Sequence, residues 1–336
     1  MGEYSSGRMA DLLNKVSVTP LDRCDWKLKQ SLPINLGKGL SVQNYSGRVP
    51  SVEFWEENLS KEDRKDLGRW SVCLEHTYLG PPHLDGEENK VSKQILVCAV
   101  ACLRFLVPSF ANGAHCLQIE ERPKKELVAF NYERPLSRAG LEGVEILSPE
   151  LDETRLYRYR VWIDWIEDFA QNAYRKYQPL WISLNFSEKS YFEFYKPLRH
   201  VLRVMALEAL FSDVKVYSGE AMESRLLPMI DGADLYSPYR SDLQSLRPMI
   251  ADKKLIKDVV VLRNDIAHGR GVPERWLKKP SQFLSSGNQS YLDDLTDAAT
   301  ALLRYVWLHI LENRLQDVFS DKAKMAQYCA SGVKIK

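Results

Sequence analysis

The sequence predicts a mainly α-helical protein, with a helical bundle in its C-terminal part and a smaller α+β region before it. Three observations lead to this fold class. Apolar residues recur at helical spacing from about residue 151 onward, two short strand-like runs lie at 116–120 and 127–132, and the 336-residue length suits two domains. Hydrophobic residues make up 45% of the chain, which is enough to bury a core without disulfides.

Overall charge and hydropathy exclude several classes of protein. The net charge is only +1, so binding to nucleic acid through overall basicity is excluded, although a local basic patch is not. The most apolar run, 95–107, contains Arg104 and falls short of the about 20 residues that a membrane span needs. Residues 1–20 lack the apolar core of a secretory signal. We therefore expect a cytoplasmic protein with no membrane association.

The six cysteines are scattered along the chain, which favours reduced thiols. Cys73 and His76, together with Cys98 and Cys102, have spacings that a zinc site can use. However, Cys98 and Cys102 lie within an apolar run, where a free cysteine behaves as a small hydrophobic residue. The sequence therefore predicts buried thiols here, with no metal and no cofactor.

The N-terminal region, 1–150, is predicted to be an accessory or sensing module. Residues 1–50 show weak periodicity and are predicted to be irregular, while the very charged segment 51–70 is predicted to be a solvated helix. A buried helix follows over 89–107 and is ended by Pro108, and the two strand-like runs after it predict a hairpin. A loop rich in glycine and proline places the domain boundary near residue 150.

Connecting helices are predicted over 151–190, beginning at an N-cap formed by Ser148, Pro149 and Glu150. Arginine and tyrosine alternate over 155–160. Such a run can bind single-stranded nucleic acid by stacking and charge. It is also typical of a helix whose tyrosines pack while its arginines stay in water, and we favour this second interpretation.

Residues 191–320 are predicted to form a four-helix unit, followed by a polar tail at 321–336. Each of four segments carries an apolar stripe on one face, which must be buried against the others. The predicted helices cover 198–211, 222–230, 254–268 and 291–318. His309 falls close to the stripe of the last helix and is predicted to be a packed histidine.

The end of the third helix gathers residues that suit RNA chemistry. Gly269 is a good residue to end a helix, which places His268 in the last turn, and Asn264 lies one turn earlier on the same face. An imidazole can take a proton from a ribose 2′-OH or give one to the leaving 5′-oxygen. The guanidinium of Arg263 can bind the phosphate through two hydrogen bonds and stabilise its added charge.

A local excess of basic residues surrounds this helix end. Residues 253–279 hold eight Lys and Arg residues against three Asp and Glu residues. Lys257, Arg270 and Arg275 are the candidate RNA-binding residues of this basic cluster. Cations also favour the C-terminus of a helix through its dipole, which accounts for Arg270 but not for the whole cluster.

The segment from Arg263 to Gly269 resembles the R-x4–6-H signature of the HEPN superfamily of helical ribonucleases and nucleotide-binding proteins. Residues 206–211 are similar to the first bundle helix of its Apea-like branch. The resemblance covers about residues 195–318. It implies a helical bundle that forms a homodimer and cleaves RNA without metal, often in toxin–antitoxin systems or antiphage defence. It also implies that Arg263 and His268 are catalytic, that Asn264 supports them, and that an antitoxin or sensor protein is a possible partner.

Helix geometry favours a site shared by two protomers. Arg263 and His268 differ by about 140° in direction and about 7.5 Å in rise on an ideal helix, so they converge on one phosphate if a two-fold axis brings them together. A turn of His268 at the helix end is the other possibility. Two further hypotheses stay open: a non-catalytic HEPN module that binds RNA, nucleotides or protein, and a helical scaffold in which His268 only caps its helix.

Overall fold

The computed structural model divides into two compact units. It describes residues 13–21, 27–28, 30–44, 72–80, 87–107, 116–121, 125–131, 150–193, 195–211, 218–231, 247–283 and 289–330. Among these, the first unit ends at Gln171 and the second begins at Asn172, about 20 residues after the boundary that the sequence predicts. The segment 51–70, predicted to be helical, lies outside the described residues.

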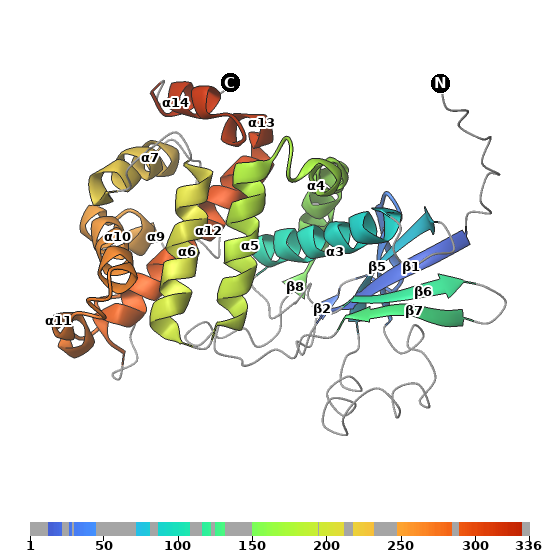
Figure 1. Ribbon diagram of the computed structural model, residues 1–336, viewed down its shortest axis with the longest axis horizontal. Coiled ribbons are helices and arrows are strands. Elements are labelled where there is room, and N and C mark those ends of the chain that lie inside the picture. The colour runs from blue at the N-terminus through green and yellow to red at the C-terminus, as the bar shows by residue number, and fades with distance from the viewer. Residues whose placement is uncertain are drawn as a thin grey trace, which may run out of the picture. The chain divides into compact units, whose positions relative to one another are not determined.

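A six-stranded antiparallel sheet forms the first unit together with α3 and α4 (Figure 1). The strand order is β3-β4-β5-β1-β6-β7. A separate parallel pair joins β2 to β8. The strands are β1 (Leu13–Pro20), β2 (Lys27–Leu28), β3 (Ile34–Gly37), β4 (Leu40–Asn44), β5 (Val72–Gly80), β6 (Cys116–Glu121), β7 (Lys125–Asn131) and β8 (Glu150–Leu151). The predicted hairpin is confirmed as the antiparallel pair of β6 and β7.

The prediction that residues 1–50 are irregular is wrong, because β1, β3 and β4 lie there. The central strand β1 is buried on both faces, and one of these faces carries the polar residues Lys15, Ser17 and Thr19. Polar and apolar residues alternate over 15–19, with Val16 and Val18 on the other face, so the two-residue period of a strand is present in the sequence. The run holds only two apolar positions, and the prediction did not include it.

Helix α3 (Glu87–Leu106) packs against β5, β1 and β6, and buries Cys98 and Cys102 as the sequence predicts. Helix α4 (Glu153–Asn172) joins the same unit, since the Tyr159 hydroxyl donates to the Ala99 carbonyl at 2.7 Å. This contact places α4 with the sheet. The predicted N-cap at 148–150 is wrong because Glu150 belongs to β8, and Asp152 Oδ1 instead accepts from the Arg155 backbone N–H at 2.7 Å.

The arginine–tyrosine run in α4 is divided between core and surface. Tyr159 is fully buried, whereas Tyr157 is 67% exposed. Arg158 is buried with its guanidinium 5.8 Å from the centre of the Trp162 ring, and Arg160 Nε donates to the Asn35 carbonyl at 3.0 Å. Arg158 therefore contradicts the expectation that the arginines stay in water, and Tyr157 contradicts the expectation that the tyrosines pack, whereas Arg160 is exposed as expected.

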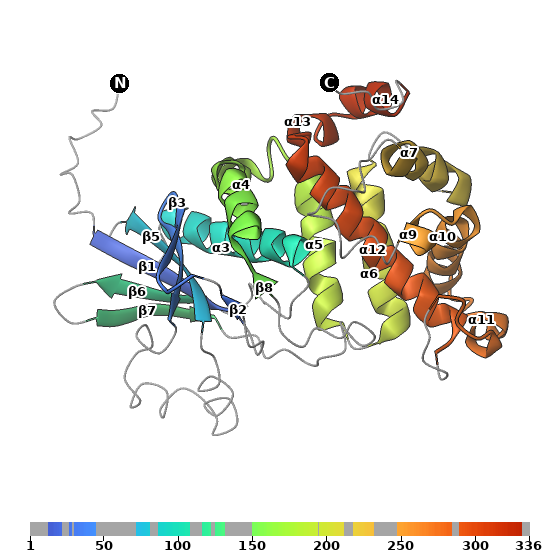
Figure 2. The ribbon, with the colours of Figure 1, turned by 180° about the vertical axis from the view of Figure 1, so that it is seen from behind.

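The second unit is helical throughout its described part. Helix α6 packs against α5, α10 and α12, while α10 also contacts α7. The four predicted helices correspond to α6, α7, α10 and α12, and Figure 2 shows α12 crossing α6. The helices are α5 (Gln178–Phe192), α6 (Lys196–Leu210), α7 (Gly219–Asp231), α9 (Arg247–Ile250), α10 (Lys253–Ala267), α11 (Glu274–Lys278), α12 (Tyr291–Glu312), α13 (Gln316–Phe319) and α14 (Lys322–Ala330).

The end of the chain differs from its prediction in two respects. Helix α12 stops at Glu312 rather than at residue 318, since Arg314 has the positive φ of 53° that interrupts a helix. Helix α14 lies in the segment predicted to be a tail. The prediction for His309 is confirmed: its side chain is buried, and its Nε2 lies 2.7 Å from the Tyr328 hydroxyl of α14.

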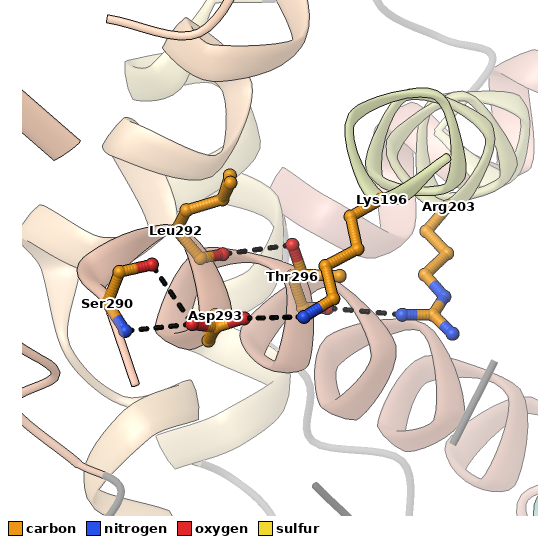
Figure 3. Close-up of polar contacts among 6 residues, drawn as sticks. All are labelled: Lys196, Arg203, Ser290, Leu292, Asp293 and Thr296. Atoms are coloured by element: carbon orange, nitrogen blue, oxygen red, sulfur yellow. Dashed lines mark hydrogen bonds and ion pairs between the residues drawn. The ribbon is translucent and has the colours of Figure 1, made fainter. Parts of the chain in front are cut away.

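The N-terminus of α12 is capped and tied to α6 (Figure 3). Asp293 Oδ2 accepts hydrogen bonds from the backbone N–H and the hydroxyl of Ser290, at 2.8 and 2.9 Å. Lys196 Nζ of α6 lies 3.3 Å from Asp293 Oδ1, and Arg203 Nη1 donates to the Thr296 carbonyl at 3.5 Å. These polar contacts fix the position of α6, which carries one residue of the candidate site, against the longest helix.

The helices that the structure describes include none long and apolar enough to cross a bilayer. Together with the N-terminal antiparallel sheet, the helical second unit confirms the predicted fold class at the level of a mainly α-helical protein with a smaller α+β region.

Candidate functional site

The end of α10 is a closed turn that holds His268 at the C-cap position. Gly269 follows with φ of +73°, as the sequence predicts for the residue that ends the helix. The backbone N–H of Gly269 donates to the Ile266 carbonyl at 3.0 Å, and that of Arg270 donates to the Asp265 carbonyl at 2.8 Å. These two bonds form a Schellman motif, which fixes the backbone of His268 while leaving its side chain exposed.

We expect the substitution Gly269→Ala to lower the free energy of unfolding by about 1 kcal/mol, because an L-residue is strained at this φ. A Cβ at Gly269 meets no described atom within 4 Å, so the cost comes from the backbone conformation alone. Urea unfolding of the full chain measures the change. Gly37, which also has a positive φ and open space around its Cβ position, provides a matched control that leaves His268 undisturbed.

Arg263 is held by two acceptors on one side of its guanidinium. Its Nη1 donates to Asn264 Oδ1 at 2.7 Å, and its Nη2 forms a short ion pair with Glu208 Oε2 of α6. The Glu208 side chain is 7% exposed and that of Arg263 is 23% exposed. The guanidinium is therefore fixed in orientation and still reaches the surface, as a phosphate-binding group must.

Glu208 is a site residue that the sequence predictions did not include. Burial raises the pKa of its carboxyl, and the charge and hydrogen bond of Arg263 oppose this shift. A signal was present, since Glu208 interrupts the otherwise apolar stretch 206–210 on α6. A carboxyl group that is buried in a helical unit needs a cationic partner, and here that partner is Arg263.

His268 is the exposed member among the four histidines that the structure describes. His76, His200 and His309 are buried. Burial lowers the pKa of both His76 and His200 to about 4, so their rings are neutral at neutral pH and cannot exchange protons with a solvent-borne substrate. The accessible imidazole is thus the one that the sequence motif singles out.

Arg263 and His268 lie five residues apart, with Arg263 inside α10 and His268 at its C-cap. Arg263 points toward α6, where its partner Glu208 lies, and His268 stands five residues later beyond the last helical turn. Five residues correspond to about 140° of rotation and about 7.5 Å of rise on a helix. A site that uses both groups on one phosphate is therefore easiest to assemble from two chains.

The basic cluster of residues 253–279 is largely paired with acidic side chains. Lys257 Nζ lies 3.1 Å from Glu223 Oε2 and 3.8 Å from Glu220 Oε1, and the hydrogen bond and charge of Glu223 raise the pKa of this ammonium group. Helices α7 and α10 approach closely here, since a Cβ on Gly219 would lie 2.9 Å from Lys257 Cα. Lys257 is therefore paired with acidic groups of α7, while its side chain stays 40% exposed.

The other two candidate RNA-binding residues are both exposed. Arg270 is exposed, with its Nε 2.9 Å from Asp265 Oδ1. Arg275 is exposed on α11, with its guanidinium 5.2 Å from the centre of the Trp276 ring. Surface pairs of this kind are weak, so both cations can turn toward a polyanion.

The described residues contain no group of three His, Cys, Asp or Glu side chains that could hold a metal ion. Cys73 and His76 lie on β5, where the Cys73 thiol is directed at the Gln43 carbonyl and His76 at Ser92, so each side chain has a protein partner. Comparison of the chain with protein families, with curated proteins and with solved structures finds no match.

Proposed function

We propose that the protein is an endoribonuclease of the HEPN type that works without a metal ion and acts as a homodimer. The observation that carries this proposal is the arrangement at the end of α10. An arginine that is fixed by Glu208 and Asn264 lies on the same helix as the accessible His268. The proposal includes a role as a toxin or antiphage effector, with an antitoxin or sensor protein as partner.

The reaction uses a nucleophile from the substrate. His268 acts as the general base that accepts the proton of a ribose 2′-OH, and O2′ attacks the adjacent phosphorus. The P–O5′ bond breaks, and O5′ leaves with a proton from an imidazolium or from water. The products are a 2′,3′-cyclic phosphate and a 5′-OH. Arg263 binds the phosphate oxygens and stabilises the negative charge that grows on them, while Asn264 and Glu208 position Arg263.

A second candidate function is RNA or nucleotide binding without cleavage. The engagement of Arg263 by Glu208 and Asn264 favours this alternative, because part of the guanidinium is already occupied. A binding module needs the cations around His268 but not the imidazole itself.

The test is incubation of labelled single-stranded RNA with the purified full chain in EDTA. We expect cleavage to cyclic phosphate products, and we expect His268→Ala to reduce the rate by about 100-fold or more, the usual contribution of a general acid or base. His268 is exposed, so this change leaves the core intact. Lys322→Ala, at an exposed position on α14, is the control and should cleave normally.

The outcomes separate the candidates. Cleavage that H268A leaves unchanged, or that stops in EDTA, contradicts the proposal. Retention of the RNA by wild type and H268A without any cleavage supports the binding module instead.

A further inference from the structure

A cavity of about 480 Å³ opens in the first unit, lined by residues of α3, of α4 and of the sheet. This volume lies within the range of small-molecule sites, about 300–1,000 Å³. The walls combine apolar side chains with a small set of polar ones, which is typical of a ligand pocket. Lys38, His76, Tyr78, Glu167 and Gln171 are the polar and aromatic residues that decide what it can bind.

A tight turn between β3 and β4 positions Lys38 at this cavity. Gly37, Lys38 and Gly39 all have positive φ, and the value for Lys38 is 48°, an unfavourable conformation for a residue with a side chain. The Thr77 backbone N–H donates to the Gly39 carbonyl at 2.9 Å, which fixes the turn on β5. Positive φ is what a tight hairpin turn requires, so the pairing of β3 with β4 fixes the place of Lys38 at the cavity.

The sheet side of the cavity is preorganised by hydrogen bonds between buried side chains, and it carries two aromatic rings. His76 Nδ1 lies 2.8 Å from Ser92 Oγ, which in turn lies 2.8 Å from Ser17 Oγ, and all three side chains are buried. The His76 and Tyr78 rings are nearly parallel, at 7°, with 5.6 Å between their centres. Tyr78 is half-buried, so this wall offers a planar ligand an aromatic surface on which to stack.

Helix α4 contributes a carboxylate and an amide to the lining of the cavity. Glu167 and Gln171 lie four residues apart on α4, and therefore project from the same face of the helix. A carboxylate accepts two N–H groups side by side, while an amide can donate one hydrogen bond to an oxygen. Glu167 is also 3.5 Å from Lys38 Nζ through its Oε2, which holds it near the ammonium group.

This order of groups matches one nucleobase. The Watson–Crick edge of guanine presents two neighbouring donors, N1–H and N2–H, followed by the O6 acceptor. The edge of adenine presents one donor and the N1 acceptor, which a carboxylate repels. Lys38 Nζ lies 3.5 Å from Glu167 Oε2, so it is close to the same base edge and can donate to O6. We propose that this cavity binds a guanine nucleotide, with the base stacked on the Tyr78 wall and its donor edge on Glu167.

The experiment is calorimetric titration of the full chain with GMP, AMP and inorganic phosphate. We expect saturable binding of GMP and no heat from phosphate alone. AMP should bind more weakly by about tenfold or more, which is the effect of losing one bidentate contact to a base. Equal binding of GMP and AMP, binding of phosphate alone, or no binding of GMP overturns the proposal. Because RNA cleavage is not measured, this result is independent of the proposed ribonuclease function.

Two variants of the same helix test the assignment of Glu167. We expect Glu167→Gln to weaken GMP binding by about tenfold, since the amide presents a donor to a donor edge. Asp164→Asn is the matched control: Asp164 also contacts Lys38 Nζ, at 3.9 Å, but does not line the cavity. This variant makes the same change of charge and should bind GMP as wild type does. Wild-type affinity of E167Q, or equal weakening by both variants, contradicts the proposal.

Discussion

An equimolar mixture of Arg263→Ala and His268→Ala chains is expected to cleave RNA at about a quarter of the wild-type rate, although each variant alone is inactive. In a site shared across a two-fold axis, Arg263 of one protomer acts with His268 of the other. Half of the dimers in the mixture contain one chain of each kind, and each such dimer has one site with both groups intact. Cleavage of labelled RNA after the chains have exchanged measures the recovery.

The control for this mixture is R263A combined with the double variant R263A/H268A. Every site in those dimers lacks Arg263, so no activity should return. A mixture of the two single variants that stays inactive, while both are folded and dimeric, contradicts the shared site and favours a turn of His268 within one protomer.

Arg263→Ala is also expected to destabilise the protein by about 2 to 3 kcal/mol at neutral pH, somewhat below the cost of breaking a fully buried ion pair because Arg263 is partly exposed. The change leaves the Glu208 carboxylate buried without its counter-charge. In the same background, Glu208→Gln should restore most of the lost stability, since a neutral amide is cheaper to bury. Cleavage should not return, because the phosphate-binding guanidinium is still missing.

The pH dependence of this destabilisation has a definite sign. Burial raises the pKa of Glu208 above its ordinary value, and removing Arg263 removes the charge that opposes that shift. In the R263A variant, Glu208 therefore binds a proton more readily in the folded chain than in the unfolded chain. The loss of unfolding free energy relative to wild type is largest at neutral pH, and it shrinks as the pH falls toward 4.5, the ordinary pKa of the carboxyl. Urea unfolding of both chains between pH 7 and pH 5 measures the difference, and a deficit that grows on acidification contradicts this account.

The helices of the second unit could be predicted from the sequence because each has an apolar stripe and a clear end. Helix α10 is the clearest case: its stripe of Leu255, Val259 and Leu262 is buried, and Gly269 ends it one residue from the predicted position. The hairpin of β6 and β7 could also be predicted, because Pro123 and two lysines separate two strand-like runs in the sequence.

Features that depend on tertiary partners could not be predicted. Strand β1 alternates polar residues with Val16 and Val18, but the sequence does not show that its polar face is buried as well, which depends on its central place between β5 and β6. The sequence indicates that Lys257 belongs to a basic cluster, but α7 supplies Glu220 and Glu223, which pair with it from 37 and 34 residues earlier. Glu208 and Arg263 are 55 residues apart, and only the packing of α6 on α10 brings them together.

The closed turn at the end of α10 also decides from which side a polyanion can reach His268. A helix carries partial negative charge at its C-terminus, located on its last carbonyl groups. The N–H groups of Gly269 and Arg270 already cover the carbonyls of Ile266 and Asp265, and the Arg270 guanidinium lies beside Asp265. A phosphate that contacts the imidazole therefore approaches over Arg270, since along the axis of α10 it would meet repulsion from the aligned peptide dipoles.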